Sequence, residues 1–81
     1  MKISSQMNER IRFLRENKGY TQQEVADMLG VSRAVYGMYE GGTRSISVEV
    51  IINLSHIYGV STDFILGLSN NTKFEGSSIE P

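Results

Sequence analysis

Apolar residues recur along most of the chain at the three- and four-residue spacing of amphipathic helices. In the first such stretch, Met7, Ile11 and Leu14 fall on one side of a helix. The spacing predicts five short helices, over residues 7–18, 22–29, 33–40, 48–58 and 62–66. The sequence lacks the apolar–polar alternation that is typical of strands. We therefore expect an all-α fold.

Residues that favour helix ends frame these segments. Thr21, followed three positions later by Glu24, forms a capping box at the start of the second helix. Ser32, Ser47 and Ser61 precede the three later helices in the N-cap position. Glycines stand where the helices are expected to end: Gly19, Gly30, Gly41–Gly42, Gly59 and Gly67. The predicted helix boundaries therefore rest on local capping chemistry as well as on hydrophobic spacing.

The core is expected to form from one face of each helix. The residues predicted to face inward are Met7, Ile11, Leu14, Val25, Ala26, Leu29, Val35, Tyr36, Tyr39, Val48, Ile51, Leu54, Ser55, Tyr58, Ile65 and Leu66. Beyond Gly67 the segment LSNNTKFEGSSIEP is polar and has neither helical nor strand periodicity. We expect one folded domain over residues 1–67, followed by a flexible tail or the start of a linker over residues 68–81.

The second and third predicted helices are joined by a very short turn, Gly30-Val31-Ser32, within the stretch TQQEVADMLGVSRAVYGMYEGG. Two helices joined so closely cross steeply, as they do in helix-turn-helix motifs that bind DNA. Ala26 is small enough to allow close approach where the helices meet. A plain helical hairpin within a bundle has the same spacing, so the turn favours DNA binding without excluding a purely structural role.

Charge is distributed unevenly along the chain. The net charge of −1 taken alone argues against a nucleic-acid ligand, but residues 1–44 hold seven basic and five acidic residues, whereas residues 45–81 hold one basic and four acidic residues. Such an asymmetry permits a basic face on an acidic molecule. It also arises from ordinary solvated surface, so it supports DNA binding only in combination with other signals.

The composition argues against several other function classes. The chain has no cysteine, and a single histidine, His56, cannot build a zinc site. The sequence contains no glycine-rich phosphate loop. Glu9, Glu16 and Glu24 have no catalytic partner nearby in the pattern and are expected on solvent-exposed helix faces. No apolar run approaches the ~20 residues that span a bilayer. We expect a cytoplasmic protein that is not an enzyme, binds no metal or cofactor and does not enter a membrane.

Three stretches carry a family resemblance: YTQQEVADMLGVS, YEGG and YGVSTDFILG. Together they resemble the lambda-repressor-like, Cro/repressor-type helix-turn-helix family of bacterial and phage transcriptional regulators. The resemblance covers roughly residues 7–67. It implies a compact five-helix DNA-binding domain whose helix-turn-helix is formed by the second and third helices. It also implies that the domain forms a homodimer, and that it belongs to a transcriptional repressor or to a phage, prophage or mobile-element regulator.

The resemblance implies specific roles for residues of this chain. The DNA-binding residues that it implies are Gln22, Gln23, Ser32, Arg33, Ala34, Gly37, Met38, Thr43 and Arg44. Among these, Gln22 would contact a phosphate at the start of the second helix, as would Thr43 and Arg44 after the third. Arg33 would carry most of the direct readout, by pairing with guanine O6 and N7. An internal ion pair between Arg15 and Glu40 is also implied.

The sequence departs from the family pattern at three positions. Ile46 stands where a proline often precedes the cap of the fourth helix. Gly37 lies inside the third helix, where glycine costs about 1 kcal/mol relative to alanine. Met38 occupies a position that is often polar, so it offers a thymine methyl an apolar contact. The reading surface is therefore poor in hydrogen-bonding groups.

The fourth and fifth helices are where this family usually pairs. On that basis Ile57 and Phe64 are expected at a dimer contact, although each also fits the edge of the core.

Two functions from different classes follow from the sequence. The leading hypothesis is a sequence-specific DNA-binding transcriptional regulator, a homodimeric repressor that binds a palindromic operator in double-stranded DNA. The alternative is a protein-interaction module, antitoxin-like or adaptor-like, whose helix-turn-helix domain mainly holds a partner protein. A salt titration separates them, because DNA binding that releases counterions weakens steeply with salt.

Overall fold

Local capping chemistry sets most helix ends in the computed structural model, which describes residues 6–70. The five helices are α1 (Met7–Lys18), α2 (Gln22–Leu29), α3 (Arg33–Gly41), α4 (Val48–Tyr58) and α5 (Thr62–Leu66). The capping box of Thr21 and Glu24 is present, and the Ser32, Ser47 and Ser61 hydroxyls each accept a backbone N–H in the first turn that follows. The predicted helices are confirmed, with α3 one residue longer than expected because Gly42, not Gly41, takes the left-handed conformation, at φ 77°.

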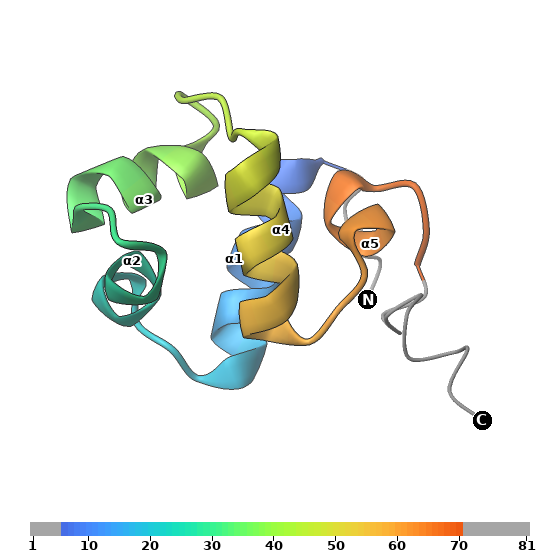
Figure 1. Cartoon of the computed structure of the whole chain (residues 1–81), viewed down its shortest axis with the longest axis horizontal. Helices are drawn as coiled ribbons and strands as arrows, with labels where there is room; N and C mark the ends of the chain where they lie inside the picture. Colours follow the sequence, from blue (N-terminus) through green and yellow to red (C-terminus); the bar gives the residue numbers. More distant parts are fainter. Residues whose placement is uncertain (1–5, 71–81) are drawn as a thin grey trace.

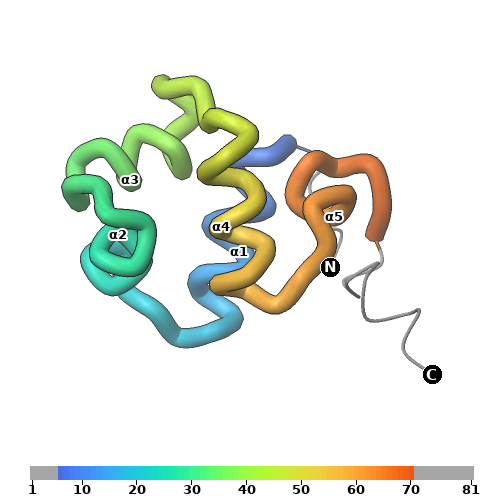
Figure 2. Tube along the Cα trace, in the orientation of Figure 1, coloured from blue at the N-terminus to red at the C-terminus, as the bar shows by residue number. Residues whose placement is uncertain are grey.

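The helices are arranged around α1 and α4, which run through the middle of the molecule (Figure 1). α2 and α3 lie together on one side of this pair, and α5 lies on the other. The tube in Figure 2 shows the short connection from α2 into α3 and the longer loop that leads from α3 over to α4. α2 packs mainly on α3, while α1 contacts α3, α4 and α5. The described residues therefore form one bundle in which α1 bridges the helix-turn-helix pair and the C-terminal helices.

The core is built mainly from the predicted faces. Its fully or nearly fully buried apolar residues are Ile11, Leu14, Val25, Ala26, Tyr36, Tyr39, Ile51, Leu54, Tyr58, Val60, Phe64 and Ile65. Two residues predicted to face inward do not. Val48 is 72% exposed because it lies in the first turn of α4, ahead of the buried stripe of this helix, which begins at Ile51. Leu66, at the end of α5, is 40% exposed because this short helix directs Phe64 and Ile65 inward instead.

Phe64 is buried, which overturns its assignment to a dimer contact. Its side chain is completely inaccessible within the single chain, and its ring lies beneath the Arg10 guanidinium, whose carbon is 4.6 Å from the ring centre. A side chain enclosed in this way stabilises the core and offers no surface to a second copy. A helix of five residues is too short for its hydrophobic spacing to show whether Phe64 faces the core or the surface.

Arg10 is a buried cation, which the helical spacing of the sequence did not predict. Its Nη1 donates to the carbonyl oxygens of Phe64 at 2.7 Å and Ser69 at 2.9 Å, and its Nη2 donates to Asn70 Oδ1 at 2.7 Å. These bonds tie α1 to the segment that follows α5. Ser69 and Asn70, which the sequence places in the predicted tail, thus contact α1, and residues 71–81 of that tail lie outside the described residues.

Within residues 6–70, no helix is both long enough and apolar enough to cross a membrane.

Candidate nucleic-acid interface

The corner between α2 and α3 is closed by backbone geometry. Gly30 ends α2 in the left-handed conformation at φ 75°, and Val31 N–H donates to the Ala26 carbonyl at 3.0 Å. The Ser32 hydroxyl then accepts from Val35 N–H at 3.1 Å and starts α3. Ala26 is fully buried in the core. The predicted tight turn is therefore present, and it fixes where α3 begins.

α3 has a buried side and an exposed side. Tyr36, Tyr39 and Glu40 face the body of the protein. The opposite side presents the exposed residues Arg33, Ala34 and Met38, with half-buried Gly37 between them. The structure thus brings the residues expected to read DNA onto one continuous face of one helix.

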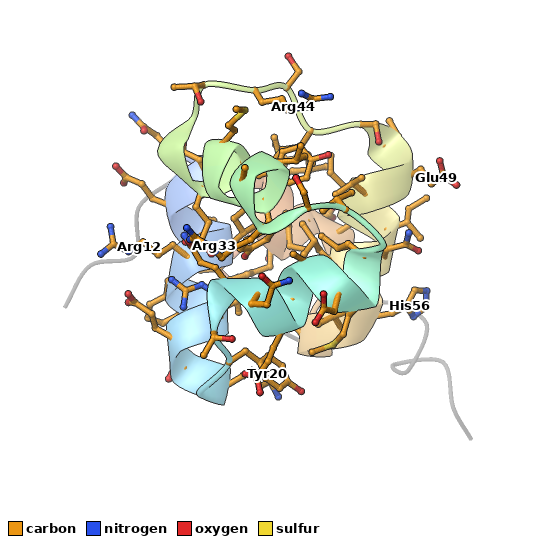
Figure 3. The ribbon with its side chains drawn as sticks, turned by 90° about the vertical axis from the view of Figure 1, so that its left-hand side faces the viewer. Arg12, Tyr20, Arg33, Arg44, Glu49 and His56 are labelled. Atoms are coloured by element: carbon orange, nitrogen blue, oxygen red, sulfur yellow. The ribbon has the colours of Figure 1, made fainter. Side chains whose placement is uncertain are left out.

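Further residues implied in DNA contact lie at the two ends of this face. Ser32, Thr43 and Arg44 are exposed, as is Gln23 in the first turn of α2. Gln23 donates to Asp27 Oδ1 on its own helix at 2.9 Å. In Figure 3, Arg33 and Arg12 lie toward the left of the view and Arg44 at the top, whereas Glu49 and His56 lie at the right edge. Cationic side chains therefore border the α3 face, and the acidic Glu49 lies away from it.

The ion pair expected between Arg15 and Glu40 is present. Arg15 Nε donates to Glu40 Oε2 at 2.6 Å and Nη2 donates to Oε1 at 3.1 Å, so the contact is bidentate. The side chains are only 13% and 4% exposed. Burial opposes ionisation of Glu40, but hydrogen bonds from Arg15, Tyr36 and Gln22 outweigh it and hold the pKa of this carboxyl below its ordinary value. The pair joins α1 to the end of α3.

Gln22 connects this ion pair to the exposed face. Its Nε2 donates to Glu40 Oε1 at 3.1 Å, and its Oε1 accepts from Arg33 Nη1 at 3.1 Å. Gln22 and Arg33 are both candidate DNA contacts, but the sequence does not predict the hydrogen bond between them, since the two residues are eleven positions apart. The first residues of α2 and α3 are therefore joined directly by their side chains.

A hollow of about 340 Å³ lies beside the α3 face. It is lined by Arg12, Arg15, Gln22, Gly37, Glu40 and Gly41. Gly37 helps to keep this space open, and a Cβ built there would meet its nearest neighbour, Gln22 Oε1, at an ordinary 3.8 Å. The hollow is thus walled by α1, α2 and α3, with polar side chains around it.

A buried tyrosine pair supports α3 from the opposite side. The hydroxyl oxygens of Tyr36 on α3 and Tyr58 on α4 lie 3.0 Å apart. Burial raises the pKa of both phenols, that of Tyr58 to about 12. Tyr36 also bonds Glu40, so the tyrosine pair continues the polar network that begins at Arg15.

The remaining candidate residues lie away from the α3 face. His56 is exposed on α4, and Ile57 is half-buried against the core. Across the residues that the structure describes, no three histidine, aspartate or glutamate side chains gather as metal ligands would.

Comparisons with known proteins point to one family. The model of the family described as "Helix-turn-helix" matches residues 11–65. The chain is 48% identical over 58 residues to the SPbeta prophage-derived uncharacterized HTH-type transcriptional regulator YonR of Bacillus subtilis (strain 168), covering 72% of this chain and 54% of that protein. It is 41% identical over 69 residues to the uncharacterized HTH-type transcriptional regulator YqaE of the same organism, covering 84% and 60%. The chain thus spans little more than half the length of these relatives.

A solved structure extends the comparison to three dimensions. The fold is similar to that of the P22 c2 repressor protein, whose crystal structure is described in complex with synthetic operator 9T, at a TM-score of 0.73 and 28% identity. The match covers 79% of this chain and 97% of the repressor chain.

Proposed function

The chain belongs to the lambda-repressor-like helix-turn-helix family of transcriptional regulators, and from that premise we propose that it recognises a specific sequence in double-stranded DNA. In this proposal α3 enters the major groove, two copies of the chain bind the two halves of a palindromic operator, and the bound dimer represses transcription by occluding a promoter.

The exposed face of α3 is the observation that carries the proposal. Its opposite side is held in the core by Tyr36 and Tyr39, so the exposed side projects from a rigid body. Arg33 stands in the first turn of that helix, where a recognition helix makes its base contacts. A cation there faces the positive end of the helix dipole, so helix stability gives no reason for it. Recognition of an electron-rich base edge, in contrast, explains why an arginine stands at this position.

The side chains on this face divide between two kinds of base contact. Arg33 pairs with guanine O6 and N7 through its planar fork of N–H donors. Ala34 and Met38 make apolar contacts with thymine methyl groups, and Gly37 leaves room for the base pairs to come close. This division predicts an operator half-site with one strongly specified guanine and weaker preferences beside it.

The surrounding residues fix the position of the helix on the phosphate backbone. Gln22 and Gln23 at the start of α2, and Thr43 and Arg44 after α3, are the residues proposed for this role, while Ser32 belongs to the face of α3 in the groove. Contacts of this kind carry no sequence information, so they contribute equally to every duplex.

Dimerisation is proposed on the side of the molecule that holds the end of α4 and α5. Ile57 remains a candidate contact. The exposed apolar side chains of Leu66 and Leu68 take the place of the buried Phe64 in the proposed dimer contact. Sedimentation over a range of protein concentrations measures this association. A chain that stays monomeric both alone and on its operator would exclude the dimer.

Selection of bound sequences from a random pool of duplex DNA tests the function as a whole. The expected result is an inverted repeat, bound with an affinity that falls steeply with salt because the protein displaces condensed counterions. If no sequence is enriched and salt has little effect, the protein-interaction module becomes the better explanation.

A further inference from the structure

The end of α3 is closed partly by a side chain from α1. The last backbone carbonyls of a helix have no partner within its regular hydrogen bonds, so they need one from elsewhere. In this turn Thr43 N–H donates to the Met38 carbonyl at 3.1 Å. The Glu40 carbonyl instead accepts from Asn8 Nδ2 on α1, at 3.2 Å and from thirty-two positions earlier in the chain. Asn8 therefore supplies a partner that the turn itself does not.

Asn8 also packs closely against this turn. Gly42 has the left-handed conformation, at φ 77°, and a Cβ built there would lie 3.2 Å from Asn8 Nδ2 and 3.4 Å from Asn8 Cγ. Gly30 ends α2 with nearly the same φ, 75°, yet a Cβ built there meets nothing within 4 Å. The turn after α3 therefore needs glycine both for its backbone conformation and for the approach of the Asn8 amide.

We propose that Asn8 is a positioning residue, which holds the turn after α3 so that Thr43 and Arg44 meet the phosphate backbone of DNA. This inference rests on the proposed function, in which those two residues contact phosphates. Both are exposed and directly follow Gly42, the residue that Asn8 touches. A segment that is ordered before binding loses less conformational entropy on contact. Because phosphate contacts carry no sequence information, the gain in affinity is common to all duplexes.

The effect on the turn can be measured first in the protein without DNA. NMR relaxation of the backbone amides of Thr43 and Arg44 reports their order, which is expected to fall in Asn8→Ala. The matched control is Asn17→Ala, which makes the same substitution at an exposed position near the other end of α1 and should leave both amides unchanged. Equal order of the two amides in Asn8→Ala and in the unmodified chain would overturn the proposal.

The effect on DNA binding is measured with the duplex recovered by selection and with duplexes of random sequence. Asn8→Ala is expected to weaken binding to all of them by one common factor of roughly 2- to 10-fold, the range for the loss of one neutral hydrogen bond. Asn17→Ala should bind as the unmodified chain does. If Asn8→Ala changes the preference between duplexes, Asn8 acts on base reading and the assignment to phosphate positioning is wrong.

A mutant cycle separates positioning from a general effect on the fold. In a chain that carries both Thr43→Ala and Arg44→Ala, Asn8→Ala should no longer alter DNA affinity, because the side chains it positions are gone. Its effect on the melting temperature should be the same in both backgrounds, since the bond to the Glu40 carbonyl is a backbone contact. A role in stability alone would weaken binding equally in the two backgrounds, which would overturn the inference.

Failure of this inference and failure of the proposed function give different results. If the unmodified chain binds DNA and Asn8→Ala binds it equally well, the inference alone is wrong. If the unmodified chain binds no duplex at all, the proposed function fails, and the positioning role of Asn8 fails with it.

Discussion

Arg15 and Glu40, twenty-five residues apart in the sequence, form a bidentate ion pair that is almost fully shielded from water. It fixes the end of α3 against α1, and through Gln22 it reaches the start of α3 as well. One buried carboxylate thus helps to set the position of the whole proposed recognition helix.

Removing either partner of this pair should destabilise the fold. Arg15→Ala leaves an uncompensated buried carboxylate, so the free energy of unfolding is expected to fall by about 3 kcal/mol, measured by urea denaturation. The control is Arg12→Ala, which breaks the exposed pair between Arg12 and Glu16, whose side chains are 64% and 55% exposed, and should change stability little. Equal small effects of both substitutions would show that Arg15 behaves as a surface charge.

Acid should weaken the fold through Glu40. Its pKa is lower in the folded chain than in the unfolded chain, so its contribution is present above the unfolded pKa of about 4.3 and is lost as pH falls through the folded pKa. The melting temperature of the unmodified chain should therefore exceed that of Glu40→Gln at neutral pH, and the gap should narrow in acid. A gap that stays constant down to about pH 3 would contradict this assignment.

Arg33→Ala should keep the fold and lose selectivity. Because Arg33 is exposed and outside the core, its removal is expected to leave the melting temperature nearly unchanged. Discrimination at one base pair per half-site should fall by roughly 1–3 kcal/mol, measured by binding to the selected operator and its single-pair variants. Unchanged affinity for both operator and random DNA would exclude a reading role for Arg33.

Two glycines should respond in opposite ways to alanine. Gly37 lies inside α3 with its nearest neighbour 3.8 Å from a built Cβ, so Gly37→Ala should stabilise the fold by up to about 1 kcal/mol. Gly30 has open space around it but a φ of 75°, so Gly30→Ala should destabilise by about 1 kcal/mol through backbone strain alone. Thermal unfolding of the two variants measures both effects. A destabilised Gly37→Ala would mean that the helix does not tolerate a side chain at this position.

Arg10 should contribute more to the stability of the fold than an exposed arginine does, because its side chain is buried. Arg10→Met removes the charged donors to the Phe64 and Ser69 carbonyls, and the loss of these buried hydrogen bonds is expected to cost on the order of 2 kcal/mol. Amides of α5 should also exchange faster with solvent, because this helix loses its bond to α1. Arg12→Met, on the exposed side of the same helix, is the matched control and should leave α5 exchange unchanged.

The residues expected to contact DNA were found from the resemblance, and their gathering on one face follows from helical spacing once α3 is identified. The coupling among Arg15, Glu40, Gln22 and Arg33 was only half foreseen. The ion pair was implied, but the amide bridge depends on how closely the starts of α2 and α3 approach, which spacing along the chain does not give.

What the sequence determined by itself was the set of helices and, to within one residue, where each begins and ends. Those boundaries are decided by contacts within three or four residues, such as the Ser61 hydroxyl on Phe64 N–H, and so they can be read locally. Only the tertiary structure decided that Phe64 turns inward, that Val48 and Leu66 face outward, and that Arg10 is enclosed. The burial of a side chain depends on which distant segment crosses over it, and Arg10 is enclosed by residues more than fifty positions away.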